Sequence, residues 1–70
     1  MIEIFKTNVQ EATEANKLAQ LLLEHFPDSK INFDLEDCDR ILRIESEKID
    51  YQRIIFFLNS QHFFCEVLTD

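Results

Sequence analysis

Three polar side chains in two predicted turns could together hold a hard divalent metal ion: Asn8, Glu11 and His62. An amide oxygen, a carboxylate and an imidazole are donors that ions such as Zn²⁺ accept. The competing interpretation makes Glu11 an acidic first-turn residue that favours the dipole of a helix, and His62 a surface residue of a turn. Because two or three exposed ligands make a poor zinc site, weak metal binding is the alternative hypothesis, behind protein interaction.

The other reactive side chains are two cysteines and a second histidine. Cys38 lies in the acidic segment "LEDCDR", which lacks the spacing and the glycine of a calcium loop. Cys65 alternates with Phe63 and Val67, which predicts a small core residue. His25 has no serine or cysteine nucleophile in an obvious relation to it. We therefore expect no catalytic residues, no cofactor and no enzymatic activity.

The amino-acid composition of the chain argues against several classes of binding partner. The 70 residues carry 14 acidic and 7 basic side chains, a formal net charge of −7. Such a surface repels phosphate backbones and anionic lipids, so we expect neither nucleic acid nor a membrane as partner. The absence of glycine excludes glycine-rich phosphate loops and dinucleotide fingerprints. Without a signal sequence or a disulfide framework, the default expectation is a cytoplasmic protein.

The first half of the chain predicts a strand followed by a helix. Residues 2–6, "IEIFK", are rich in β-branched side chains, as is typical of a strand. Over residues 12–26 apolar side chains recur every three or four positions, which predicts an amphipathic helix that ends before Pro27. Thr7 or Asn8 is the expected N-cap of this helix, with Gln10 or Glu11 three positions on completing a capping box.

The second half predicts a hairpin, a helix and a last strand. Alternation over residues 31–35 and again at 42–44 predicts two strands joined by a turn. Asp50 is the expected N-cap of a helix through "YQRIIFFLNS", and residues 63–68 alternate as the last strand. The order strand-helix-strand-strand-helix-strand predicts a single α+β domain over residues 1–70. Its expected form is the ferredoxin-like βαββαβ sandwich, a four-stranded antiparallel sheet with two helices on one face.

The whole chain also resembles the heavy-metal-associated domain of small copper chaperones and metal pumps. The segment "TNVQEATEANKL" follows the course of the family's M-T-C-x-x-C turn and first helix, with Thr7 at the family's threonine. The segments "KINFDLED" and "RILRIES" resemble its second and third strands, and "IIFFLNSQHFFCEVL" is similar to its closing helix and strand. The resemblance implies the ferredoxin-like fold, and it covers nearly all of residues 1–68.

The family's metal motif is missing from this chain. Asn8 and Glu11 stand where the family has its two cysteines, and His62 falls in a turn where the family normally has glycine. Cu(I) is a soft ion that prefers thiolate ligands, and oxygen donors do not replace them. We therefore expect no copper transfer from this domain.

Alternation predicts more apolar side chains than one face of the sheet requires. Expected on the face covered by helices are Ile2, Ile4, Ile31, Phe33, Leu35, Leu42, Ile44, Phe63, Cys65 and Val67. Expected on the open face are Phe5, Ile41, Phe64 and Leu68. Phe56 and Phe57 widen the apolar side of the second helix beyond one face. A contiguous exposed patch usually marks a contact surface, so we predict an interaction surface formed by Phe5, Ile41, Phe56, Phe64 and Leu68. The predicted function is a non-enzymatic interaction or regulatory module whose partner is another protein or a second copy of the chain.

Overall fold

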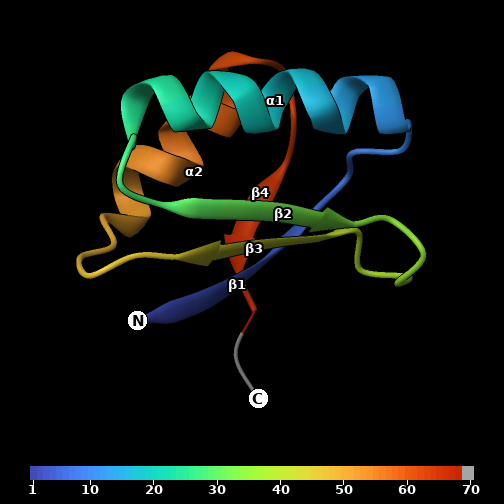
Figure 1. The fold of residues 1–70 in the computed structure, drawn as a ribbon. Helices are drawn as coiled ribbons and strands as arrows, with labels where there is room; N and C mark the ends of the chain where they lie inside the picture. Colours follow the sequence, from blue (N-terminus) through green and yellow to red (C-terminus); the bar gives the residue numbers. More distant parts are fainter. Residues whose placement is uncertain (69–70) are drawn as a thin grey trace.

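The computed structural model describes residues 1–68 and contains six elements (Figure 1). They are β1 (Ile2–Thr7), α1 (Ala12–His25), β2 (Lys30–Asp34), β3 (Ile41–Glu45), α2 (Tyr51–Ser60) and β4 (Cys65–Val67). All strand pairings are antiparallel, and the strand order in the sheet is β2-β3-β1-β4. Both helices lie over the same face of the sheet (Figure 1). The predicted α+β class with a four-stranded antiparallel sheet is confirmed, and the arrangement is compatible with a ferredoxin-like fold.

Local sequence signals explain the bounds of α2 and the end of α1. The Asp50 side chain accepts a hydrogen bond from the backbone N–H of Arg53 at 3.1 Å, which is the predicted N-cap of α2. At the end of α1, the backbone N–H of Phe26 donates to the carbonyl of Leu22 at 2.7 Å, just before Pro27. Pro27 has no N–H to continue this pattern, so the chain turns away.

The start of α1 differs from the prediction. The N-cap is Glu11 rather than Thr7 or Asn8, and its backbone N–H donates to the Glu14 carboxylate at 3.4 Å. The reason is that Thr7 still belongs to β1, and Val9 in the connection is fully buried. The helix therefore begins only after Val9 has entered the core.

The helices cover the face of β1 that was predicted to be open. Phe5, expected on the open face, is fully buried, and its ring centre lies 6.2 Å from that of Tyr51. Ile2, expected on the covered face, has 48 % of its surface exposed, and Ile4 is only half-buried. Alternation alone cannot say which face of a strand is covered. Here the helices cover the face that carries the larger Phe5 side chain.

The core lies between the helices and the sheet. Its buried members come from both helices, three strands and the β1–α1 connection. They are Phe5, Val9, Ala15, Leu18, Leu22, Leu42, Ile44, Ile54, Leu58 and Cys65. Glu3 also faces this side of the sheet, at its margin, where its carboxylate accepts a hydrogen bond from the Tyr51 hydroxyl at 2.8 Å. Within residues 1–68 neither helix has both the length and the apolar character needed to cross a membrane.

Candidate functional site

The corner between β1 and α1 is held by side-chain hydrogen bonds to two other segments. The buried Thr7 hydroxyl donates to the Arg40 carbonyl at 2.6 Å and accepts from the Val9 N–H at 3.2 Å. The Asn8 amide oxygen accepts from the Phe64 N–H at 2.8 Å. The first turn, the β2–β3 hairpin and the segment before β4 therefore meet at one end of the sheet.

The three candidate metal ligands of this end have separate surroundings. The Asn8 oxygen is occupied by the Phe64 N–H, and Glu11 is the exposed N-cap of α1. His62 is exposed and has a left-handed backbone with φ 72° in the turn after α2. Within residues 1–68, neither Glu11 nor His62 belongs to a group of three or more His, Cys, Asp or Glu ligand atoms. Each of the three residues thus has a role in a turn or cap.

One such group lies at the tip of the β2–β3 hairpin. Ligand atoms of Asp37, Cys38 and Asp39 lie within 4.8 Å of one another. The Asp37 carboxylate already accepts the Asp39 N–H at 2.8 Å, and the Asp39 carboxylate lies 3.7 Å from the Lys6 ammonium. The Asp37 carboxylate therefore stabilises the turn, as aspartate side chains in turns commonly do, and the Asp39 carboxylate forms an ion pair.

The thiols and His25 have the surroundings of structural residues. Both cysteines are free, Cys38 exposed and Cys65 buried. Burial, assisted by the charge of Glu66, raises the pKa of Cys65 from its ordinary value of 9.0 to about 12. Cys65 is therefore a neutral thiol at physiological pH. The His25 ring centre lies 5.1 Å from that of Phe57, a helix-to-helix aromatic contact.

The predicted interaction residues do not form one patch. Phe5 is in the core, and its neighbour Lys6 occupies the open face instead. In the sheet register Lys6 lies between Ile41 of β3 and Glu66 of β4, so charged side chains separate Ile41 from the last strand. Ile41 is half-buried, whereas Phe56, Phe64 and Leu68 are exposed. The exposed fractions are 75 % for Phe56, 46 % for Phe64 and 36 % for Leu68.

The most exposed of these rings borders a groove between α2 and the end of α1. We call it the aromatic groove; its volume is about 720 Å³. Its lining includes His25, Phe26, Arg53, Phe56 and Phe57. The Arg53 guanidinium lies 5.2 Å from the centre of the Phe26 ring, in a cation–π contact. Sequence reasoning identified Phe56 and Phe57 but missed Arg53 and Phe26, because their pairing depends on how the two helices pack.

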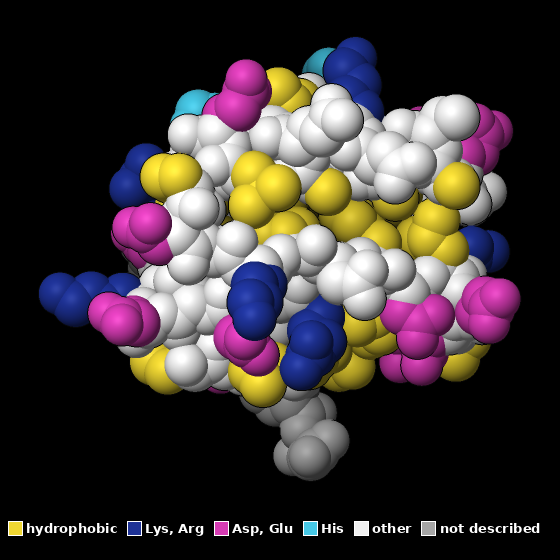
Figure 2. All heavy atoms as spheres, viewed as in Figure 1, with side chains coloured by type: hydrophobic (Ala, Val, Ile, Leu, Met, Phe, Trp, Pro, Cys, Tyr) yellow, Lys and Arg dark blue, Asp and Glu magenta, His cyan; other side chains and the backbone are white. Residues whose placement is uncertain are grey.

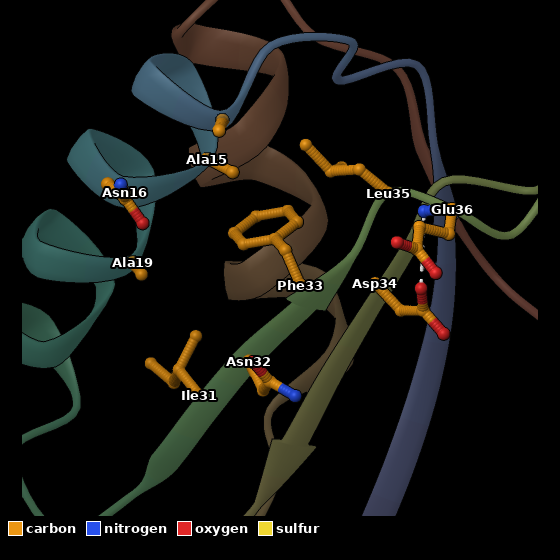
Figure 3. Close-up of a pocket in the computed structure, with 10 residues that line it drawn as sticks. Ala15, Asn16, Ala19, Ile31, Asn32, Phe33, Asp34, Leu35 and Glu36 are labelled. Carbon is orange, nitrogen blue, oxygen red and sulfur yellow. Dashed lines mark hydrogen bonds between the residues drawn. The ribbon is translucent and has the colours of Figure 1, made fainter.

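A second groove of about 530 Å³ runs between α1 and β2. Figure 2 shows apolar side chains along it, between the helix layer and the edge of the sheet. Ile31 and Phe33 point from β2 toward Ala15 and Ala19 of α1, and Asn32 points away from the helix (Figure 3). Ile31 and Phe33 are only half-buried although they pack against the core. We call this hollow the α1–β2 groove.

In comparisons with known proteins, no family model, curated protein or solved structure matches the chain. The resemblance to heavy-metal-associated domains therefore stays a prediction from the sequence. The surfaces and side chains described above are the grounds for assigning a function.

Proposed function

We propose that this chain is a non-enzymatic protein-interaction domain with a ferredoxin-like βαββαβ fold, related in pattern to heavy-metal-associated domains but without their metal ligands. The observation that carries the proposal is Phe56, whose ring is 75 % exposed beside the aromatic groove. Fully burying a side chain of this size stabilises a protein or a complex by about 1.5–3 kcal/mol. Because the Phe56 ring is mostly exposed in the isolated domain, most of this stabilisation would be gained only in a complex.

The neighbours of Phe56 support the same proposal. Arg53 lies one helical turn before Phe56, and both line the aromatic groove. Phenylalanine and arginine are both enriched in protein interfaces relative to the rest of the protein surface. Arg53 already lies over the Phe26 ring, so a partner would lose less side-chain entropy in ordering it. Phe26 and Phe57, both half-buried, would form the floor of the contact.

The chemistry of the polar residues also favours binding over catalysis or metal transfer. Within residues 1–68, no buried side-chain nitrogen or oxygen lacks a hydrogen-bond partner. Unpaired buried polar groups are rare in native proteins, and a catalytic role or a bound ion is among their explanations. The Asn8 oxygen and the Asp37 carboxylate, which could have served as ligands, are engaged by backbone N–H groups. These observations give the interaction hypothesis precedence over the weak metal site at Asn8, Glu11 and His62.

The test is affinity capture with three immobilised forms of the domain, followed by identification of the bound proteins. The forms are wild type, Phe56→Ser and the control Gln20→Ser, which changes an exposed residue of α1. We expect at least one protein that binds wild type and Gln20→Ser stoichiometrically and is lost from Phe56→Ser. A set of bound proteins that is identical for all three forms would contradict the proposal.

A further inference from the structure

Among the residues that the structure describes, the edge strand β2 has a backbone partner on one side only. It is the first strand in the order β2-β3-β1-β4, and its other side pairs with β3 over five consecutive residues. Natural edge strands are protected from further pairing by proline, by a bulge, by charged side chains or by being very short. β2, "KINFD", has no proline, pairs with β3 in unbroken register and carries charges only at its two ends, Lys30 and Asp34. Its free side borders the α1–β2 groove (Figure 2).

The register determines which backbone groups of β2 face outward. Met1 and Ser46 exchange two backbone hydrogen bonds, of 2.7 and 2.9 Å, so they are a hydrogen-bonded pair of the β1–β3 ladder. Because such pairs alternate along an antiparallel ladder, Leu42 and Ile44 direct their backbone groups toward β1. The alternate residues of β3 face β2 instead. They are Ile41, Arg43 and Glu45, which pair with Asp34, Asn32 and Lys30. The N–H and C=O groups of Ile31 and Phe33 therefore lie on the free edge.

The side chains of β2 are complementary to a second β2 strand. If a second copy pairs antiparallel about a two-fold axis at Asn32, Lys30 of each copy lies opposite Asp34 of the other. On the groove side, Ile31 lies opposite Phe33 of the second copy. Opposite charges and apolar pairs directly across a ladder stabilise an antiparallel sheet. This register also pairs the outward backbone groups of Ile31 with those of Phe33.

We propose that two copies of this chain associate through β2, joining their sheets into one eight-stranded sheet. The α1–β2 grooves of the two copies meet over the seam, where the half-buried Ile31 and Phe33 become covered. The α1 side chains over this seam include Ala12, Ala15 and Ala19, which leave room for the second copy. The proposal concerns a different surface from the aromatic groove and does not depend on the function proposed above.

The other edge of the sheet does not offer the same match. β4 has three residues, and a two-fold axis at its centre would place Glu66 directly opposite Glu66 of the second copy. Like charges in that position destabilise a sheet. Charge complementarity therefore selects β2 as the edge that pairs.

The test uses the two charged positions, both on exposed side chains, in sedimentation equilibrium. In a dimer of the Lys30→Asp variant, the acidic residue at position 30 of each copy lies opposite Asp34 of the other copy. In a dimer of the Asp34→Lys variant, the basic residue at position 34 of each copy lies opposite Lys30 of the other copy. Each variant alone should raise the dimer dissociation constant at least about tenfold. An equimolar mixture of the two single variants should form a heterodimer with wild-type affinity. The double variant Lys30→Asp/Asp34→Lys should form a homodimer with wild-type affinity. Circular dichroism checks that each variant is folded.

A second readout locates the seam. Amide hydrogen exchange at Ile31 and Phe33 should slow as wild-type protein concentration rises, while the amides of Asn32 and Asp34, bonded to β3, stay protected throughout. A wild-type chain that remains monomeric at about millimolar concentration overturns the proposal. So does a dimer that the single charge reversals leave intact. Neither result bears on Phe56, because the binding of a partner to the aromatic groove is measured separately.

Discussion

The amide oxygen of Asn8 accepts a hydrogen bond from the backbone N–H of Phe64 at 2.8 Å, across 56 positions of sequence. The bond lies just before β4, a strand of three residues whose one partner within residues 1–68 is β1. Asn8 thus continues with its side chain the ladder that β1 forms with its backbone. The residue that stands at a metal-ligand position in the heavy-metal-associated pattern has an architectural role here.

Replacing Asn8 should loosen the start of β4. We expect Asn8→Ala to lower the free energy of unfolding by about 0.5–1.5 kcal/mol, because one hydrogen bond is lost. Asn8→Asp keeps an acceptor oxygen at the same place and should cost less. Urea unfolding of the three proteins measures the difference, and amide exchange at Phe64 reports whether the strand is released. Equal stability of wild type and Asn8→Ala would show that the bond contributes nothing.

The two phenylalanines of opposite exposure should respond differently to truncation. Phe5→Ala removes a fully buried ring, for which we expect a loss of about 3–5 kcal/mol of unfolding free energy. Phe56→Ala changes a ring that is 75 % exposed, and the expected change is within about 0.5 kcal/mol. Denaturant unfolding gives both values. Similar losses for the two variants would mean that Phe56 belongs to the core and is not available to a partner.

The two thiols should differ in reactivity. With its pKa raised to about 12, Cys65 stays protonated and buried, so a thiol reagent at pH 8 should label one cysteine per native chain and two per unfolded chain. The variant Cys38→Ser should show no rapid labelling. Two rapidly labelled thiols in native wild type would contradict the burial of Cys65.

The same pKa shift predicts weaker folding in alkali. Because the folded-state pKa of Cys65 lies above its ordinary value of 9.0, the unfolded chain releases this proton first. The free energy of unfolding should therefore fall as pH rises from about 9 to about 12. Tyr51, whose pKa is raised by its hydrogen bond to Glu3, adds to this loss above pH 10.0. Cys65→Ala should show a shallower decline, and an unchanged decline would assign it to other groups.

Sequence reasoning was most accurate where one local signal decides the structure. Asp50 and Pro27 mark the start of α2 and the end of α1 because an acceptor side chain and a missing N–H act on their nearest neighbours. The order of the six elements and the antiparallel sheet followed from alternation and helical spacing. The exposure of Phe56 and Phe64 was also predicted, since neither fitted the covered face of its element.

Besides the N-cap of α1, the main error concerns β1, where two arrangements satisfy the same pattern. The strand has Ile2 and Ile4 on one face and Phe5 with Thr7 on the other, so alternation allows either face to be buried. A buried threonine is acceptable only if its hydroxyl has partners, and those partners, Arg40 and Val9, come from a loop and a turn. The contact with Arg40 is long-range and has no signal in the strand itself. The aromatic groove could not be predicted for the same reason, because it depends on how α2 packs against the end of α1.

The weak metal hypothesis leads to a clear negative expectation. Titration of the domain with Zn²⁺, Co²⁺ and Cu(I) should show no binding tighter than about millimolar, because the Asn8 oxygen is engaged and two exposed ligands do not hold zinc. Glu11→Ala and His62→Ala should titrate like wild type. A stoichiometric site that disappears in both variants would restore metal binding as the function.

The central claim is that the domain works by burying Phe56 against a protein partner. The most direct measurement is the dissociation constant of the captured partner for three forms: wild type, Phe56→Ser and Gln20→Ser. Loss of a ring at the centre of an interface should weaken binding at least about tenfold, with Gln20→Ser equal to wild type. Equal dissociation constants for wild type and Phe56→Ser would contradict the account.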